Sequence, residues 1–148
     1  MRQYLRFAAM IGTSTIAMFG LMYLNTYELA DVFFSETRAY MAFMMGAAMA
    51  IIMLAFMLNM HRNHRVNVGI FVCSAIAFAL ALWLVRSQST IDDVSWMKAM
   101  IPHHSIAILT SERADLSDPR VHELAGQIIE SQRREIEEMK ALINDLEK

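Results

Sequence analysis

Three long apolar segments separated by short polar stretches make up the first half of the chain. They cover about 5–24, 39–60 and 66–85. Each has about 20 residues, the length that an α-helix needs to cross a hydrocarbon core about 30 Å thick. The pattern therefore predicts a region of three transmembrane helices over residues 1–86.

The first apolar segment follows Arg2 and Arg6, an arrangement that signal peptides share. No cleavage pattern of two small residues around a third follows near residues 25–30. We therefore expect an uncleaved signal anchor.

Charges flanking the apolar segments predict their orientation. Acidic residues dominate the first loop, whereas four arginines flank the other ends: Arg2, Arg6, Arg62 and Arg65. The positive-inside rule then places the N-terminus in the cytoplasm. Three crossings put the chain after Arg86 on the far side, which predicts a protein of the bacterial inner membrane with a periplasmic C-terminal domain.

Two amphipathic helices are predicted after the polar stretch 86–90. Thr90, with Asp92 and Asp93 behind it, indicates a helix start, and that helix runs to about Ala114. Asp118 as N-cap and Pro119 as first helical residue begin a second helix that extends to about residue 146. Its apolar residues recur at three-four spacing. Residues 90–148 should therefore form an antiparallel hairpin, and the fold class is all-α.

A hairpin of two amphipathic helices cannot enclose a core by itself. Its apolar stripe must pack against something else, and a homodimer that completes a four-helix bundle is the simplest arrangement. A higher homo-oligomer, or docking on a membrane or periplasmic protein partner, fits the same pattern.

Composition does not change the predicted helices, but it excludes several classes of function. The chain has 148 residues, of which 56% are hydrophobic and 19% charged. Beside a membrane region there is room for one small domain, which argues against a multidomain enzyme with a large cleft. Neither half carries a strong basic excess, so nucleic acid is not an expected partner. Cys73 is the single cysteine, which rules out an intrachain disulfide and a cysteine-based zinc site.

The segment 96–108 carries the candidate chemistry. Met100, His103 and His104 lie three and four residues apart, so they project from one side of a helix. Pro102 removes a backbone donor beside them, which favours a kink. Imidazole and thioether groups together form a ligand set that suits copper better than magnesium or calcium.

The second helix repeats the same spacing. A turn centred near residue 117 should bring His103 level with Gln132, Met100 with Glu135, and Met97 with Met139. The predicted metal ligands are Met100, His103, His104, Glu135 and Met139. We expect Gln132 to orient an imidazole by hydrogen bonding. His122 lies about 15 Å of helix rise from Gln132, so it should be outside the site.

Packing without metal is the competing interpretation of this hairpin site, because histidines on amphipathic helices are usually half-exposed and methionines usually fill cores.

Methionines recur every four residues in the second apolar segment, from Met41 to Met57, and they too could either bind metal or only pack. They could form a Cu(I) path, but positions at that spacing wind around the helix instead of facing one side. His61 and His64 follow this segment in a loop where we expect contact with solvent or lipid headgroups.

Residues 91–147 resemble the bacterial family called domain of unknown function 305. Members share a Met-Ile-Pro-His-His segment followed by Ala-Ile, here Met100–His104 and Ala107-Ile108. The second helix also follows the family pattern: Leu124-Ala125, Ile128-Ile129, Gln132, Glu135-Ile136 and Met139.

The resemblance implies a ferritin-like helical bundle that faces the periplasm and is associated with copper binding and copper tolerance. The hairpin would then be half of such a bundle. Many members carry further methionines just after the histidine pair, where this chain has Ile106 and Thr110. Fewer thioethers argue against high-capacity storage and favour a single site per hairpin or per dimer.

These patterns together predict a membrane-anchored periplasmic protein that binds copper, Cu(I) rather than Cu(II), and buffers it or hands it over in copper homeostasis. We do not expect an enzyme, because a copper enzyme needs an open coordination position and a substrate pocket. The alternative is a membrane-tethered helical module for dimerisation or docking, without a metal site.

Overall fold

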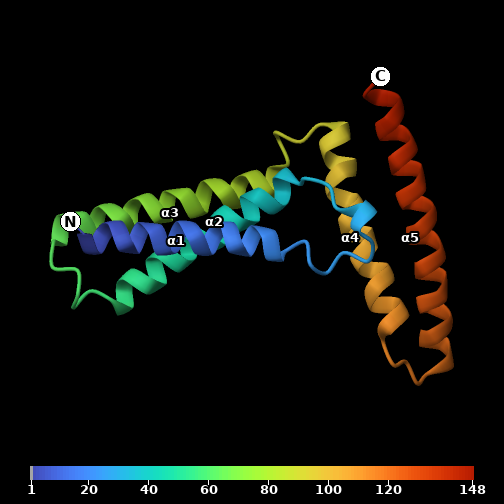
Figure 1. The fold of residues 1–148 in the computed structure, drawn as a ribbon, viewed down its shortest axis with the longest axis horizontal. Coiled ribbons are helices and arrows are strands. Elements are labelled where there is room, and N and C mark those ends of the chain that lie inside the picture. Colours follow the sequence, from blue (N-terminus) through green and yellow to red (C-terminus); the bar gives the residue numbers. More distant parts are fainter. Residues whose placement is uncertain (1) are drawn as a thin grey trace. The chain divides into compact units, whose positions relative to one another are not determined.

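The computed structural model describes residues 2–148, and these form an all-α fold (Figure 1). The five α-helices are α1 (Arg2–Leu21), α2 (Glu36–Phe56), α3 (His64–Ser87), α4 (Asp93–Arg113) and α5 (Pro119–Leu146). A short 3-10 helix, η1 (Leu29–Asp31), lies in the connection between α1 and α2. The predicted fold class is confirmed.

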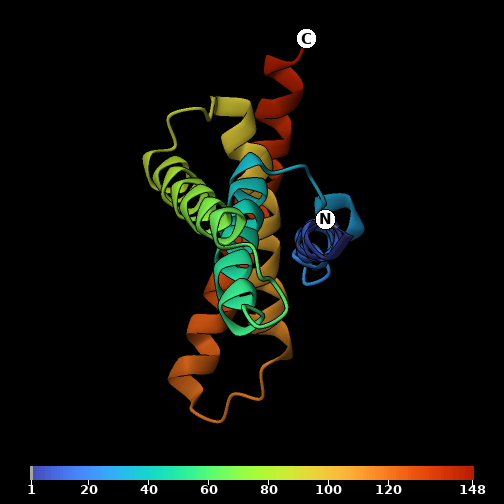
Figure 2. The same cartoon turned by 90° about the vertical axis from the view of Figure 1, so that its left-hand side faces the viewer.

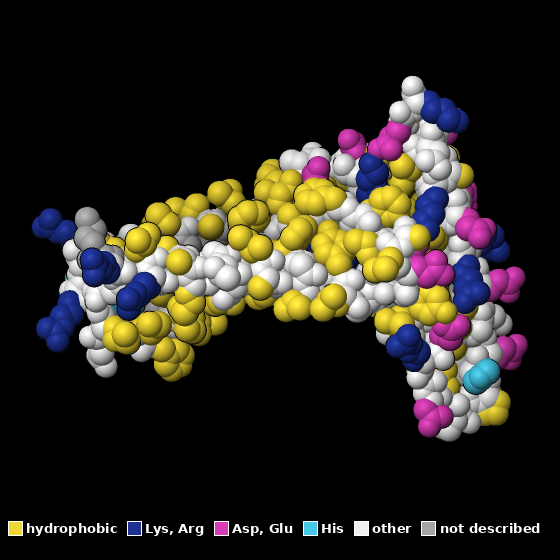
Figure 3. All heavy atoms as spheres, in the orientation of Figure 1, with side chains coloured by type: hydrophobic (Ala, Val, Ile, Leu, Met, Phe, Trp, Pro, Cys, Tyr) yellow, Lys and Arg dark blue, Asp and Glu magenta, His cyan; other side chains and the backbone are white. Residues whose placement is uncertain are grey.

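Helices α1, α2 and α3 are each long and apolar enough to cross a membrane, as the sequence predicts. Large apolar side chains cover their outer surfaces (Figure 3), and Ile16 and Phe43 are 75% and 66% exposed. Water would penalise such exposure, whereas lipid chains accept it.

The chain divides into two compact units. The apolar unit contains the chain up to Met22 together with Thr37–Thr90, and the hairpin unit contains Tyr23–Glu36 together with Ile91–Lys148. The connection between α1 and α2 thus belongs to the hairpin unit, which the sequence pattern did not indicate.

In the apolar unit, α1 and α3 begin at the same end at which α2 terminates, and Figure 2 views the unit from this end. Phe7, Ala50 and Leu54 form the buried centre. Gly46 brings α2 so close to α1 that an added Cβ would overlap the hydroxyl of Thr15. Glycine thus sets the distance between two of the helices.

Helix caps in the hairpin unit follow the sequence closely. The side chain of Asp118 accepts a hydrogen bond from the backbone N–H of Arg120, and Pro119 occupies the first turn of α5, as predicted. At α4 the cap is Asp92, which accepts from the N–H of Ser95 at 2.7 Å. Thr90, the expected start, instead hydrogen-bonds the hydroxyl of Tyr40.

An apolar core holds α4 and α5 antiparallel. Its buried members are Met97, Ile101, Ile108, Ile136, Met139 and Ile143. Ion pairs between the helices join Glu112 with Arg133 and Lys98 with Glu147, and the imidazole of His104 faces the carboxylate of Glu135.

The register of the two helices differs from the expected one. His104 faces Glu135, about five residues, or more than one helical turn, beyond the position that a turn centred on residue 117 would place beside it. Ala114 and Asp118, which flank the connection, have extended backbones instead of a tight turn. The apolar stripes, and not the turn, therefore set the register.

A buried polar network attaches the segment Tyr23–Glu36 to both hairpin helices. Asp31 is 4% exposed, and one of its carboxylate oxygens accepts a hydrogen bond from the hydroxyl of Ser105 at 2.7 Å. The other oxygen accepts from Lys140 at 2.5 Å. The Ser105 hydroxyl, itself fully buried, also accepts from the backbone N–H of Tyr27 at 2.9 Å. Every atom in this network has a partner, as a buried carboxylate requires.

Gly46→Ala should lower the thermal stability of the detergent-purified protein, at a cost of about 1–3 kcal/mol. Thr15 cannot move aside easily, because it is β-branched and its hydroxyl donates to the carbonyl of Ile11 at 2.9 Å. Gly12→Ala is the matched control, since nothing lies within 4 Å of a Cβ at that glycine. Equal melting temperatures for the two variants would contradict the close approach.

Asp31→Ala should destabilise the protein by about 1–3 kcal/mol, because it leaves a buried hydroxyl and an ammonium group without their acceptor. Chemical denaturation measures the loss. Glu28→Ala in the same segment is exposed and should change little. A strictly additive effect of Asp31→Ala and Lys140→Met would show that the two side chains do not interact.

Candidate metal-binding site

The structure brings together two of the five predicted ligands, His104 on α4 and Glu135 on α5. The Nδ1 atom of His104 lies 3.0 Å from Oε2 of Glu135, and the imidazole is 15% exposed. The two atoms are close, but the contact lacks hydrogen-bond directionality, so the buried Nδ1 has no hydrogen-bond partner among residues 2–148. A buried nitrogen without a partner is costly unless a ligand or a small shift satisfies it.

Two neighbours on α5 hold the Glu135 carboxylate in place. Ser131 donates a hydrogen bond to Oε1 at 2.7 Å, and Gln132 donates to Oε2 at 3.4 Å. Gln132 therefore contacts the carboxylate and not, as expected, an imidazole. Sequence reasoning overlooked Ser131, although its position four residues before Glu135 places both on one helix face.

His103 is exposed, beside the half-buried His104. The two ring centroids are 6.0 Å apart and the rings are inclined by 60°. Imidazole nitrogens bind metals at about 2 Å.

Both predicted thioether ligands lie at the apolar core of the hairpin. Met139 is 7% exposed and belongs to the buried cluster, and Met100 packs against that cluster from α4. Pro102 is buried as well, and α4 continues through it. His122 is exposed on α5.

In the part of the chain that the structure describes, no three His, Cys, Asp or Glu side chains gather closely enough to hold a metal ion. Methionine sulfur is a further kind of metal donor, and Met100 is three residues before His103 in α4. The predicted ligand set, which combines both donor types, stays a prediction.

The electrostatic environment keeps His104 neutral. Burial lowers the pKa of His104 below its usual value of about 6.5, the Glu135 carboxylate opposes this shift, and His103 adds to it. The neutral ring is the form that binds metals.

A folded-state pKa below the unfolded one implies that stability falls as the medium is acidified. The unfolded chain takes up the proton at His104 more readily, so its contribution is complete above about pH 6.5 and is lost as the pH falls through the lowered folded-state value. Unfolding free energies measured between pH 5 and 8 should show this loss, and His104→Gln should reduce it. His122→Gln, which alters an exposed histidine, is the matched control. An unchanged pH profile in His104→Gln would contradict the assignment.

Comparisons with known proteins place the hairpin in a family. The family model "Domain of unknown function (DUF305)" matches residues 84–147. The chain is also 31% identical over 144 residues to an uncharacterized protein of Acanthamoeba polyphaga mimivirus, and the match covers 93% of each chain, the apolar helices included. No solved structure is significantly similar. The chain belongs to the DUF305 family.

Proposed function

We propose that this protein is a membrane-anchored metal-binding protein whose hairpin unit binds copper and buffers it or hands it to a partner. The observation that carries the proposal is the neutral, half-buried imidazole of His104, whose Nδ1 faces the Glu135 carboxylate at 3.0 Å without a hydrogen bond. A carboxylate that accepts a hydrogen bond from one ring nitrogen is the usual means of orienting a histidine whose other nitrogen binds a metal, and a small shift of the His104 ring or the Glu135 carboxylate would complete that bond.

In this proposal Met100, His103 and His104 supply the ligands from α4, and Met139 supplies a thioether from α5. Glu135 orients His104 instead of binding the metal directly. Thioethers and imidazoles favour Cu(I) over the harder Cu(II). Because the ligands must be deprotonated, copper affinity should fall as the medium becomes acidic.

The membrane arrangement supports an extracytoplasmic site. Three helices of sufficient length, with arginines at the ends where α1 and α3 begin, favour a cytoplasmic N-terminus and a hairpin on the far side of the membrane. In a bacterial cell that compartment is the periplasm.

A second candidate function is a docking or dimerisation module. Four large apolar residues of α5 are about half exposed: Val121, Leu124, Leu142 and Leu146. Another copy of the hairpin would cover them and complete a four-helix bundle. This arrangement is compatible with a metal site, but it does not require one.

The test is a Cu(I) competition titration of the full-length protein in detergent, beside the double variant His103→Ala/His104→Ala. We expect near-stoichiometric copper in the parent protein and loss of at least tenfold in affinity in the double variant. His122→Ala serves as the control, because this histidine is exposed and outside the site. Glu135→Gln should weaken binding by about 10–100-fold if the carboxylate orients His104.

Two results would refute the metal proposal. Equally weak binding by the parent and the double variant would leave the docking module as the function. Equal losses in His122→Ala and in the double variant would show adventitious binding by surface histidines.

A further inference from the structure

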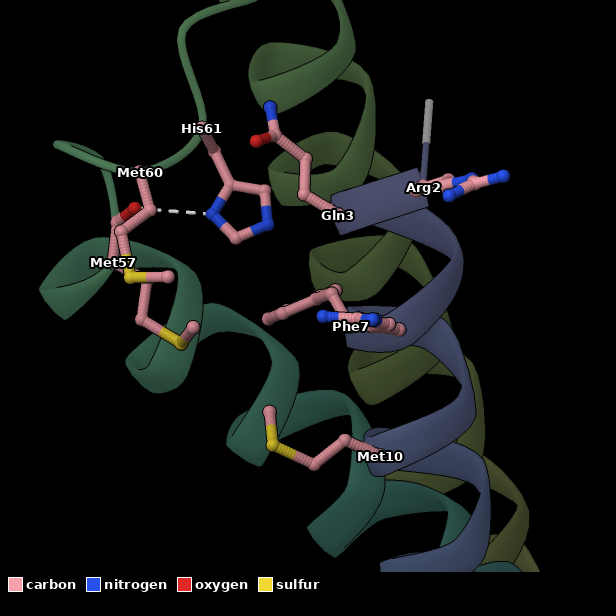
Figure 4. A pocket seen from close by; sticks show the side chains of 8 residues that line it. Arg2, Gln3, Phe7, Met10, Met57, Met60 and His61 are labelled. Atoms are coloured by element: carbon pink, nitrogen blue, oxygen red, sulfur yellow. Dashed lines mark hydrogen bonds between the residues drawn. The ribbon is translucent and has the colours of Figure 1, made fainter.

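A pocket of about 430 Å³ opens in the apolar unit, at the end where α1 begins and α2 terminates (Figure 4). Its lining is amphipathic. Arg2, Gln3 and Arg6 provide polar groups from the first turns of α1, and the remaining lining is mostly apolar. An amphipathic pocket at the end of membrane-spanning helices has the chemistry of a lipid headgroup site.

The charge of the apolar unit is entirely positive. It contains six arginines and no aspartate, glutamate or lysine. Four of the arginines lie at the end that holds the pocket: Arg2, Arg6, Arg62 and Arg65. Figure 3 shows basic side chains gathered at this end of the helices. No carboxylate of the unit can neutralise Arg2 or Arg6, so the pocket favours an anion over a cation.

His61 contributes a buried polar atom to the lining. The residue is 2% exposed, whereas the sequence predicted contact with solvent or headgroups. It is buried because the rings of Tyr4 and Phe7 pack edge-on against the imidazole, with ring centroids 4.8 and 5.5 Å away. Its Nδ1 lies 3.0 Å from the carbonyl oxygen of Met57. Since a carbonyl only accepts, Nδ1 carries a proton, and in the neutral imidazole Nε2 then presents a lone pair.

The Nε2 atom of His61 has no hydrogen-bond partner within residues 2–148. Figure 4 shows it on the side of the ring turned away from the Met57 carbonyl, toward α1. A buried acceptor of this kind matches a hydroxyl or ammonium donor on a ligand. Phosphatidylglycerol carries hydroxyl donors next to an anionic phosphate.

The apolar part of the lining fits the remainder of such a ligand. Phe7 and Met10 from α1 face Met57 and Met60, which lie in the turn directly after α2, across the pocket. Methionine side chains adapt to irregular apolar partners, including acyl chains. A small water-soluble anion would leave this wall without a contact.

We propose that this pocket binds the headgroup of an anionic phospholipid with a hydroxylated headgroup. Arg2 and Arg6 bind the phosphate, Nε2 of His61 accepts a hydrogen bond from the headgroup hydroxyl, and the methionines with Phe7 contact the first part of the acyl chains. The site rests on insertion of α1–α3 in a membrane and is independent of copper binding by the hairpin unit.

The experiment measures lipid retention by native mass spectrometry and thermal stability in detergent micelles, with added dioleoyl phosphatidylglycerol or dioleoyl phosphatidylcholine. Phosphatidylglycerol should raise the melting temperature and remain bound at one copy per chain, and phosphatidylcholine should do neither. Arg2→Gln/Arg6→Gln should lower phosphatidylglycerol affinity at least tenfold. These arginines are exposed, so the variant should still fold, as its melting temperature without lipid verifies.

Arg62→Gln/Arg65→Gln is the matched control, because it removes the same charge from the same end of the unit without altering the lining. The pocket predicts a change of less than twofold in this control. His61→Phe keeps a packing ring but removes the acceptor, and it should weaken phosphatidylglycerol binding while the response to phosphatidylcholine stays unchanged.

Three outcomes would overturn the proposal. Equal losses in the two double arginine variants would reduce the effect to general surface attraction. Competition by glycerophosphate at the same concentration as the lipid would identify a site for small anions instead of lipid. Retention of phosphatidylcholine as strong as that of phosphatidylglycerol would show a nonspecific lipid contact.

Discussion

The buried carboxylate of Asp31 is the interaction on which the hairpin unit depends. It joins three separate parts of the chain, because Ser105 lies on α4, Lys140 lies on α5, and Asp31 itself belongs to the segment between α1 and α2. A carboxylate removed from water is stable only when its oxygens are satisfied, so the three parts must keep their relative positions. The segment Tyr23–Glu36 thereby packs as a third element against two helices that could not enclose a core alone.

The Asp31 network also restricts the position of the candidate metal site, because one of its members is adjacent to His104 in the sequence. Ser105 directly follows His104, so the hydrogen bonds that fix the Ser105 hydroxyl also fix the turn of α4 that carries the histidine pair. Apolar packing of Met97, Ile101 and Met139 sets the height of α5 against that turn. Glu135 then faces His104, and Ser131 fixes the carboxylate from its own helix. The site is thus built from rigid helical positions, as precise ligand geometry requires.

Charge divides the two units in a way that matches the two proposed ligands. All 15 acidic residues of the chain belong to the hairpin unit, where we propose a metal cation. The apolar unit has arginines without acids, and there we propose an anionic headgroup. Each proposed ligand is opposite in sign to the charge around it, which lowers the energy of binding at both places.

The sequence by itself determined the elements of this protein. Apolar runs of about 20 residues fixed α1, α2 and α3, and Asp118 with Pro119 fixed the start of α5, because these signals are local and arise from helix length and capping. His103, His104 and Met100 could also be identified from the sequence, because their spacing along one helix is a local signal. Only the tertiary structure decided the register of α4 against α5, since it follows from the packing of two apolar stripes and not from the connection between them. It also decided the roles of Asp31, Ser105 and the buried His61. Asp31 binds Ser105 and Lys140, which are 74 and 109 residues away in the chain, and His61 packs against Tyr4, which is 57 residues away. Contacts over such separations leave no periodic trace in a sequence, so the physical reason for these residues appears only when the chain is folded.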